Sequence, residues 1–225
     1  MTETIVQQQY DQLAKKYDRR WRKYITSTLS ILKTWADIAP QAKILDVACG
    51  TGEFERLLLS EHSAEMIVGV DLSEEMLAIA RHKLSNYPNV SFYHASASSL
   101  PFPEGCFNVI VSANAFHYFD RPDIALLEMR RVLDQAGQVV ILDWCRDDWV
   151  CRVCDFWLTL VDPAHRQCYT QAEFHAHLRS AGFAITRAAR VRTGWIWGLM
   201  IATAVPTLSI EANQEVSATE AKHLS

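Results

Sequence analysis

The sequence predicts a doubly wound α/β fold, in which helices cover both faces of a mostly parallel sheet. Short apolar runs typical of strands alternate with helical patterns along most of the chain, and this alternation is typical of parallel sheets. Two strand-like runs near the C-terminus, 183–191 and 194–204, predict a final hairpin. Because the two strands of a hairpin are antiparallel, we expect an antiparallel strand at or near one edge of the sheet.

Five earlier strands are predicted from short apolar runs bounded by turn residues. They lie at 43–47, 66–70, 90–94, 107–112 and 138–144. The run FNVIVS at 107–112 is nearly all apolar, as a strand covered on both faces should be.

Local signals predict the helices. Ser73, followed by two glutamates, resembles a capping box and should open a helix with the apolar stripe Met76, Leu77, Ala80 and Leu84. A helix at 122–133 should bury Ile124, Leu127, Met129 and Leu133. Gly137 should end it in the left-handed conformation. The capping-box pair Thr170 and Glu173 should open a helix that ends near Gly182. Other helices are expected from about residue 53, over 10–21 outside the sheet, and within 145–169.

Length and composition describe one globular domain with short additions. The chain has 225 residues, 49% of them hydrophobic and 21% charged, and a net charge of −4. This mild acidity is the opposite of the basic surface that nucleic acid requires. Polar residues interrupt every apolar run before the ~20 residues of a spanning helix, and the first residues lack the layout of a signal peptide. We therefore predict a cytoplasmic protein with reduced cysteines, no nucleic-acid partner and no integral membrane segment.

A glycine loop follows the first predicted strand, at the edge of the sheet where doubly wound folds bind ligands. Gly50 and Gly52 would let the backbone approach a ligand closely. Asp46, Glu53 and Glu55 surround the loop, and carboxylates at a helix start oppose the binding of a phosphate. The third glycine of a dinucleotide motif and the lysine of a P-loop are both missing. Asp71, which ends the second strand, can accept hydrogen bonds from ribose hydroxyls. A ribose-bearing, cationic ligand without phosphate is S-adenosylmethionine.

Longer motifs agree with this ligand. ILDVACGTG at 44–52 is joined by GVDLSEEMLAIAR at 69–81, by HASASSLPFPEGCFNVIVSANAFHYF at 94–119 and by LLEMRRVLDQAGQVVILDW at 126–144. Together they resemble class I S-adenosylmethionine-dependent methyltransferases, in particular the small-molecule enzymes of the methyltransferase type 11 and ubiquinone–menaquinone kind. The resemblance covers roughly 10–204. It implies a Rossmann-like, seven-stranded sheet and transfer of a methyl group.

The resemblance also implies a set of cofactor contacts. The methionine end would lie against Asp46, Ala48, Gly50, Gly52, Asn114 and Ala115. The ribose and adenine end would lie against Asp71, Leu72, Met76, Ser96 and Ala97. Within these sets Asp46 would orient the ammonium group, Asp71 would bind the ribose, and the Ala97 backbone N–H would reach the adenine. Apart from the resemblance, Tyr17 on the predicted helix at 10–21 could cover the cofactor as part of a lid, or belong to a packing face of that helix.

Ser96 is a departure from the family pattern. The family usually has an acidic side chain at this position beside the adenine amino group. A serine hydroxyl can accept the same hydrogen bond without charge assistance. We therefore expect weaker recognition of adenine, with the cofactor retained.

Four further residues are candidates for the methyl acceptor, and one for catalysis. His117 follows the fourth strand and could act as a general base, or it could only form a pocket wall. Acceptor contacts are predicted for Trp21, Trp149, His165 and Tyr169. Trp21 could instead belong to a packing face of its helix, and His165 could be a surface residue. Trp149, with Trp144, Phe156 and Trp157, could form an aromatic wall of the acceptor pocket or belong to the core.

Four of the six cysteines cluster at Cys145, Cys151, Cys154 and Cys168. Zinc sites usually use two C-x-x-C pairs, and this cluster contains one. Buried cysteines that act as small apolar residues are commoner, so no metal is predicted. Because arsenic methyltransferases resemble this chain in their core, thiolate-assisted arsenite methylation remains an alternative.

The sequence thus predicts a methyltransferase that uses S-adenosylmethionine to methylate an O, N or C atom of a small aromatic or apolar metabolite. The expected organisation is an N-terminal helical lid at 1–40, a main domain at 41–206 with an acceptor-side insertion at 145–169, and a loose tail at 207–225. A monomer or homodimer is expected. A regulatory relative that binds the cofactor without catalysis is a second alternative. A nicotinamide-dependent oxidoreductase is a third, which Glu53 and Glu55 at the helix start oppose.

Overall fold

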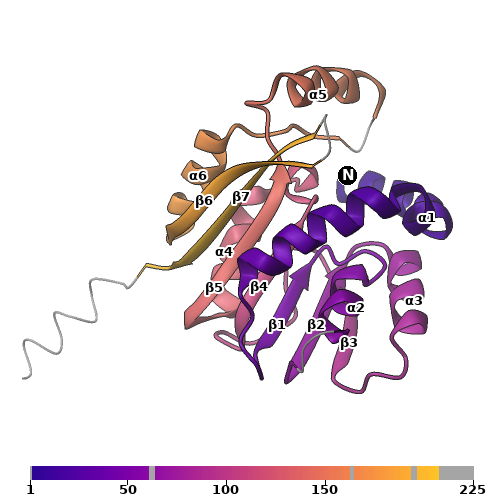
Figure 1. The fold of residues 1–225 in the computed structure, drawn as a ribbon, viewed down its shortest axis with the longest axis vertical. Coiled ribbons are helices and arrows are strands. Elements are labelled where there is room, and N and C mark those ends of the chain that lie inside the picture. The colour runs from indigo at the N-terminus through magenta and orange to yellow at the C-terminus, as the bar shows by residue number, and fades with distance from the viewer. Residues whose placement is uncertain (1, 61–63, 163–164, 194–196, 208–225) are drawn as a thin grey trace, which may run out of the picture.

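A computed structural model describes residues 2–60, 64–162, 165–193 and 197–207. Within them, seven strands form one sheet in the order β3-β2-β1-β4-β5-β7-β6 (Figure 1). The strands are β1 Lys43–Val47, β2 Met66–Asp71, β3 Val90–His94, β4 Phe107–Ala113, β5 Leu133–Trp144, β6 Phe183–Thr193 and β7 Trp197–Pro206. β7 is antiparallel to β5 and to β6, whereas β1 to β5 are parallel. The predicted mixed sheet with a C-terminal hairpin is confirmed, although residues 194–196 between its strands lie outside the described part.

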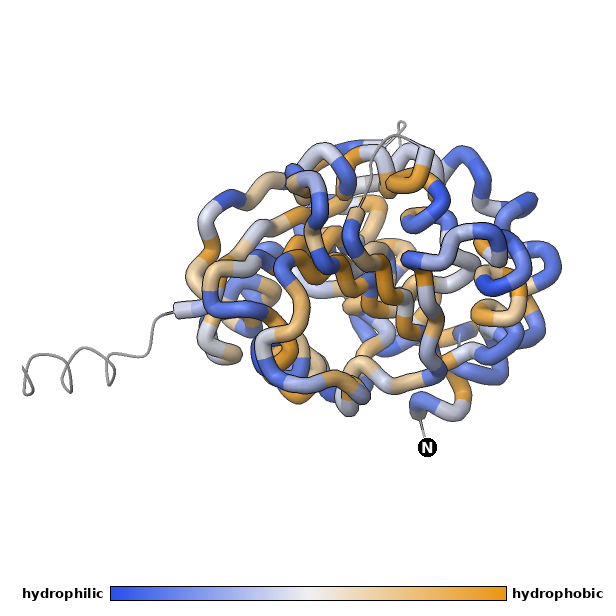
Figure 2. The backbone as a smooth tube through the Cα atoms, turned by 90° about the horizontal axis from the view of Figure 1, so that it is seen from below, coloured by the Kyte–Doolittle hydropathy of each residue, from blue (hydrophilic) through white to orange (hydrophobic). Residues whose placement is uncertain are grey.

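The helices pack on both faces of this sheet. They are α1 Thr2–Ala36, α2 Glu53–Leu59, α3 Glu74–Lys83, α4 Pro122–Val132, α5 Trp149–Val161 and α6 Gln171–Ser180, with a short 3-10 helix η1 at Phe116–Tyr118. Leu126 of α4 and Phe174 of α6 belong to one buried core. Leu32 of α1 and Phe54 of α2 belong to a second core on the opposite face. Figure 2 accordingly shows the apolar segments gathered in the middle of the molecule.

α1 is longer than the sequence predicted. Instead of a separate helix over 10–21, one helix of 35 residues runs from Thr2 to Ala36. Its C-terminal part, from Ile25 to Ala36, packs on the sheet as part of the second core. Its N-terminal part lies near the carboxyl ends of the strands. None of the helices that the structure describes is long and apolar enough to cross a membrane.

Two predictions around α4 are wrong. The helix buries Ala125, Leu126, Met129 and Val132, whereas Leu127 is 50% exposed. Gly137 does not end the helix in a left-handed turn, because β5 already begins at Leu133. A Cβ atom at Gly137 would lie 2.7 Å from the Asn108 carbonyl oxygen. Glycine is therefore needed there for the close approach of β5 to β4.

The predicted helix caps are found. The Ser73 hydroxyl accepts a hydrogen bond from the Met76 backbone N–H at 3.1 Å, but methionine at this position cannot complete a capping box. Thr170 and Glu173 make both bonds of a capping box at the start of α6. Gly182 follows α6 with a positive φ of 81°, as a helix-ending glycine should.

Candidate cofactor and acceptor site

A central cavity lies where the strand order reverses, between β1 and β4, beneath the N-terminal part of α1 (Figure 1). This switch point is the usual ligand site of doubly wound sheets. The void measures about 790 Å³, including the part open to solvent. Nine of the predicted cofactor residues line it: Tyr17, Ala48, Gly50, Asp71, Leu72, Met76, Ala97, Asn114 and Ala115. The segments after four strands, together with α1, therefore bring together residues that are far apart in the sequence.

Asp46 lines a second, smaller void of about 420 Å³. Tyr17, Ala48, Gly50 and Asn114 line both voids, so the two are neighbours on either side of the glycine loop. Asp46 is 4% exposed. The predicted ammonium partner thus lies beside the central cavity and does not line it.

The backbone of the glycine loop is left-handed at three alternate residues. Ala48 has a φ of 65°, Gly50 of 56° and Gly52 of 75°. At Ala48, which carries a Cβ, this conformation costs about 1–2 kcal/mol. The Asp71 carboxylate accepts hydrogen bonds from the Gly50 N–H at 2.8 Å and the Ser73 N–H at 2.9 Å. These bonds tie the loop to the end of β2.

The two glycines have different roles. A Cβ at Gly50 would meet no protein atom within 4 Å, and Gly50 lines both voids. Glycine at this position therefore leaves room on the ligand side of the loop. A Cβ at Gly52 would lie 3.1 Å from the Ala80 Cβ and 3.3 Å from Phe92. Gly52 is a packing residue under the loop and lines neither void.

Three carboxyl groups are buried around the loop. Burial raises the pKa of Asp46 and Asp71 above the ordinary value, and the charges of Glu55 and Asp71 raise that of Asp46 further. Burial raises the pKa of Glu55 to about 8. Neither carboxyl oxygen of Glu55 has a hydrogen-bond partner. Lys83 is paired with Glu53 and, at 2.9 Å, with Asp18.

This environment fits a cationic ligand. A buried acidic cluster is stabilised by a positive charge and destabilised by a phosphate. The ammonium and sulfonium groups of S-adenosylmethionine supply such charge, and the open side of Gly50 supplies the space. The residues present therefore fit this cofactor.

Ser96 does not line the central cavity, but it positions a residue that does. The Ser96 hydroxyl donates a hydrogen bond to the Glu3 carboxylate at 2.5 Å. Glu3, from the first turn of α1, lines the cavity together with Ala97 and Leu72. The Glu3 carboxylate thus lies next to Ser96, the position at which this sequence lacks the acidic side chain of the family. Sequence reasoning missed Glu3, because nothing in the local pattern places the start of α1 beside the loop after β3.

Two more carboxylates of α1 repeat this arrangement. The Ser73 hydroxyl donates to Asp11 and the Thr51 hydroxyl to Asp18, each at 2.5 Å. Asp18, Asp11 and Glu3 therefore hold the loops after β1, β2 and β3 in turn. Because these acids are seven or eight residues apart, they lie on one side of the helix. We call these three contacts the α1 clasp.

Tyrosines close the cavity below α1. Tyr10, Tyr17 and Tyr118 line it, and the rings of Tyr10 and Tyr118 meet edge to face at 5.6 Å. Burial raises the pKa of Tyr10 and Tyr17 well above the ordinary value and that of Tyr118 to about 12. The hydroxyls are therefore neutral at physiological pH.

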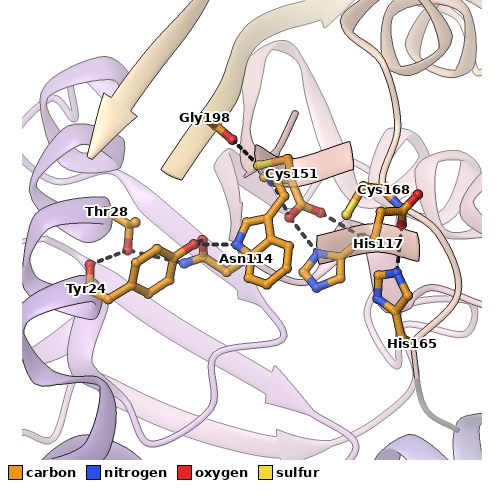
Figure 3. A network of polar contacts seen from close by, with 11 residues as sticks. Tyr24, Thr28, Asn114, His117, Cys151, His165, Cys168 and Gly198 are labelled. Atoms are coloured by element: carbon orange, nitrogen blue, oxygen red, sulfur yellow. Dashed lines mark hydrogen bonds and ion pairs between the residues drawn. The ribbon is translucent and has the colours of Figure 1, made fainter. Parts of the chain in front are cut away.

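His117 forms a buried pair with an acid at the end of β5. Its Nδ1 lies 2.6 Å from Asp143 Oδ1, and its backbone N–H donates to Asp143 Oδ2 at 2.7 Å (Figure 3). The ring stacks on Trp144 at a centroid distance of 5.0 Å. An ionised carboxylate at Nδ1 favours the tautomer whose Nε2 carries a free electron pair. Sequence reasoning missed Asp143, although an acid within the apolar run VVILDW was a usable signal.

A hydrogen-bonded chain links this pair to the cavity. The Trp144 indole N–H donates to the Tyr24 hydroxyl at 2.6 Å, and Tyr24 donates to Asn114 Oδ1 at 2.6 Å (Figure 3). The Asn114 amide also donates to the Thr28 hydroxyl at 3.2 Å. Asn114 lines the central cavity and has a positive φ of 55°. α1 thus orients a cavity residue and the ring on which His117 rests.

The predicted acceptor residues are not gathered at one place. His165 is buried, its Nε2 lies 2.7 Å from Asp155 Oδ1, and its ring is 5.8 Å from that of His117. Tyr169 belongs to the core and packs against Phe116. Trp21 lines a separate hollow on α1. Among these residues, His165 lies beside His117.

The expected aromatic wall is not formed. Trp149, Phe156 and Trp157 are 72%, 64% and 60% exposed, so they do not belong to the core, and none of them lines the central cavity. Trp149 borders a separate surface hollow with Arg190 and Gly198. The opposite side of α5, which includes the buried Cys151, faces the protein. Trp144, on β5 rather than α5, is the member of this group that reaches the site.

The cysteine cluster is largely buried. Cys145, Cys151 and Cys168 are buried and Cys154 is half-buried. Burial raises the pKa of Cys151 to about 11 and that of Cys168 further, so both are thiols at neutral pH. In the part of the chain that the structure describes, Cys168 also lies within 4.8 Å of ligand-capable atoms of Asp155 and His165. The Asp155 oxygen already accepts the Cys168 N–H at 2.6 Å.

A seven-stranded sheet of this order, with a glycine loop after β1 and an acid at the end of β2, defines the class I methyltransferase fold. Comparison with known proteins agrees. Residues 44–137 match the model of the methyltransferase domain family. The demethylmenaquinone methyltransferase of Staphylococcus epidermidis is 34% identical over 149 residues, which are 60% of this chain and 58% of that protein. The enzyme of the same name from Thermus thermophilus is 38% identical over 128 residues, 56% of this chain and 55% of that protein.

The similarity has two limits. The matches span less than two thirds of the length of these relatives. Solved structures below 25% identity show the fold alone: the [4+2]-cyclase SpnF has a TM-score of 0.79 at 20% identity, covering 93% of this chain and 98% of its own. A methyltransferase from Aquifex aeolicus has a TM-score of 0.66 at 24% identity, covering 87% and 98%. Residues 44–137 match a methyltransferase domain, and the curated relatives to which the chain is similar are named methyltransferases, in agreement with the resemblance.

Proposed function

We propose that this protein transfers a methyl group from S-adenosylmethionine to a small apolar, ring-bearing metabolite. The observation that carries the proposal is the buried acidic cluster around an open glycine loop, with Asp46 and Asp71 on its two sides. This site fits a cationic nucleoside and opposes NAD or ATP. Relatives named demethylmenaquinone methyltransferases suggest the acceptor class.

Each residue has a proposed task. When bound, S-adenosylmethionine supplies an electrophilic methyl group. Asp46 holds the ammonium group, Asp71 binds the ribose, and Leu72 and Met76 cover the adenine. The tyrosines below α1 exclude water, which would compete with the acceptor. Such transfer depends above all on alignment.

We propose His117 as the general base for an acceptor that loses a proton. Asp143 holds its Nδ1 proton, so Nε2 can take the acceptor proton. The acceptor would enter beside Tyr118, which lines the cavity next to His117 in the sequence. His165 lies close enough to contact it. We also propose that residues 1–40 act as a lid and that residues 41–206 form the main domain. We propose further that the protein is a monomer or a homodimer.

Calorimetry and product release test the proposal. We expect binding of S-adenosylmethionine, and none of NAD or ATP, to the purified chain. With demethylmenaquinone and a panel of phenols, S-adenosylhomocysteine should be released in proportion to methylated product. Uptake of NAD or ATP in place of S-adenosylmethionine would refute the proposal. Binding without release for any acceptor would favour the non-catalytic alternative.

Glu3 should replace the missing acid at the adenine. Among the carboxylates of the central cavity, Asp71 is bonded to the glycine loop and Asp120 to Arg166 at 3.0 Å. Glu3 accepts the Ser96 hydroxyl through Oε1, beside the position where the family has its acid, and we propose that it accepts the adenine amino group there. Replacing it, as Glu3→Ala, should weaken S-adenosylmethionine binding about 10-fold or more, the value of one charge-assisted hydrogen bond.

A second substitution provides the control. Ser96→Asp in the Glu3→Ala background should restore the affinity measured by calorimetry, since it returns the acid to the family position. An analogue that lacks the 6-amino group should bind wild type and Glu3→Ala equally. Equal loss for both ligands would instead assign Glu3 to the α1 clasp alone.

A further inference from the structure

α5 presents its most apolar side to solvent. Trp149, Val153, Phe156, Trp157, Leu160 and Val161 are between 50% and 72% exposed. Because they are spaced by three and four residues, they form one stripe along the helix. We call this stripe the outer face of α5. Other large apolar residues that are exposed in the described ranges, such as Leu127 on α4, lie apart on other elements.

Bonds on the opposite side hold the helix in this orientation. Asp148 caps the start of α5 by accepting the Val150 N–H at 3.0 Å. The Cys151 thiol donates to the Gly198 carbonyl at 3.1 Å. Asp155 accepts from His165 Nε2 and from the Cys168 N–H, at 2.7 and 2.6 Å. Cys151 and Asp155 of α5 therefore face the protein, and the outer face cannot turn inward without breaking these contacts.

We infer that the outer face of α5 docks on the surface of a lipid bilayer that contains anionic lipid. Helices that lie in a bilayer surface carry tryptophan, phenylalanine and leucine on one side. The indole of tryptophan suits the boundary between headgroups and acyl chains. α5 has 13 residues, so it could lie in this boundary but not cross the bilayer.

Charge around the outer face fits anionic headgroups. Arg152 is exposed on α5 itself, and Arg190 and Arg192 are exposed beside its first turn. The neighbouring aspartates are used within the fold: Asp148 caps the helix through one oxygen and pairs with Arg192 at 3.2 Å through the other, and Asp147 accepts the Gln171 N–H at 3.0 Å. Arg152 and Arg190 therefore supply the positive charge beside the outer face, although the chain carries a net charge of −4.

The shape of the surface favours lipid over a second copy. α5 is a single helix at one end of the molecule, beyond the ends of β6 and β7 (Figure 1). A ridge of this kind needs a groove on a protein partner, whereas lipid adapts to it. No second apolar surface is found among the exposed residues of the described ranges. A second copy could therefore pair through α5 itself and through no other apolar surface.

Docking would serve the proposed function, on which this part of the inference rests. Asp155 on the inner side of α5 holds His165, whose ring lies 5.8 Å from that of His117. The helix that would contact the bilayer therefore borders the proposed acceptor site. An apolar acceptor dissolved in the bilayer would reach the site without crossing water.

Vesicle flotation tests the inference. The wild-type chain should float with vesicles of phosphatidylcholine and phosphatidylglycerol, and less with phosphatidylcholine alone. Phe156→Ser/Leu160→Ser should reduce the floating fraction about 10-fold, because binding scales with buried apolar area. Leu127→Ser, a substitution of an exposed leucine on α4, should float like wild type. A wild-type chain that stays with the aqueous phase would overturn the inference, as would equal loss for Leu127→Ser.

Two further measurements separate the explanations. Sedimentation without lipid should show the same mass for wild type and Phe156→Ser/Leu160→Ser. A wild-type dimer that this variant dissociates, with no flotation, would assign the outer face to a second copy. Calorimetry with S-adenosylmethionine on the same samples reports the proposed function. Binding of this ligand without flotation overturns docking alone, and flotation without ligand binding supports docking while refuting the methyltransferase proposal.

Discussion

His117→Ala is expected to lower kcat by about 10²- to 10⁴-fold for an acceptor that must lose a proton, the usual contribution of a general base. The imidazole is buried, its Nδ1 is held by Asp143, and its Nε2 is the nitrogen left to accept a proton. Removing the ring leaves the cofactor residues in place. S-adenosylmethionine affinity, measured by calorimetry, should therefore stay within a few-fold of wild type. The measurement is the rate of S-adenosylhomocysteine release at several pH values.

Asp143→Asn is the matched control for this prediction. The amide keeps the shape of the carboxylate, but it no longer favours the tautomer with a free Nε2. We expect a loss of kcat similar to that of His117→Ala. His117→Gln should not recover the rate, since its amide cannot take a proton. Near-normal turnover of His117→Ala across the pH range would leave the ring as a pocket wall.

Glu55→Gln should remove a large pH dependence of folding stability. The folded pKa of Glu55 is about 8, well above the ordinary 4.5, so folding takes up a proton between these values. Stability from this group is fully present below pH 4.5 and is lost as the pH rises to about 8. The slope is at most about 1.4 kcal/mol per pH unit. Because glutamine has no charge to bury, the stability of the variant relative to wild type should increase as the pH rises through this range.

Chemical denaturation of wild type and Glu55→Gln at pH 5, 6, 7 and 8 measures the difference in their free energies of unfolding. We expect this difference to reach about 1 kcal/mol or more. Because the charge of Glu55 also raises the pKa of Asp46, Glu55→Gln should relieve part of that rise and add to the gain in the same direction. Glu53→Gln is the control on the same helix: Arg56 and Lys83 lower the pKa of Glu53 despite burial, so its removal should not stabilise the fold at high pH. Parallel stability curves for wild type and Glu55→Gln would show that Glu55 is ionised in the folded chain.

Local patterns predicted the sheet well and the helical faces less well. The limits of β1 and β3 agree with the short runs from which they were predicted, although β1 is buried after Lys43 whereas β3, at the edge of the sheet, is half-buried or exposed. Gly137 was misread, since its reason is the Asn108 carbonyl oxygen on a neighbouring strand. The stripe of α4 was misread because both Leu126 and Leu127 are apolar, and only packing decides which one is buried.

Sequence reasoning identified those cavity residues for which a single segment of the chain forms both the loop and the side of the cavity. Gly50 and Asp71 fall into this class, and they do line the central cavity. Glu3 and Asp143 were missed, because each reaches its partner from a distant part of the chain. The outward turn of Trp149 and Phe156 was missed for a related reason. Aromatic residues are usually expected to be buried. Here the hydrogen bonds of Asp155 to His165 and Cys168 hold the other side of α5 against the protein, so the aromatic side is exposed.

Under the proposed function, the α1 clasp should limit the rate of turnover. α1 runs over the central cavity as one continuous helix, and the loops after β1, β2 and β3 are bonded to its Asp18, Asp11 and Glu3. We expect S-adenosylhomocysteine to leave only after these three hydrogen bonds break, and lid motions of this kind take microseconds to milliseconds. Product release, rather than methyl transfer, would then set the pace of repeated cycles.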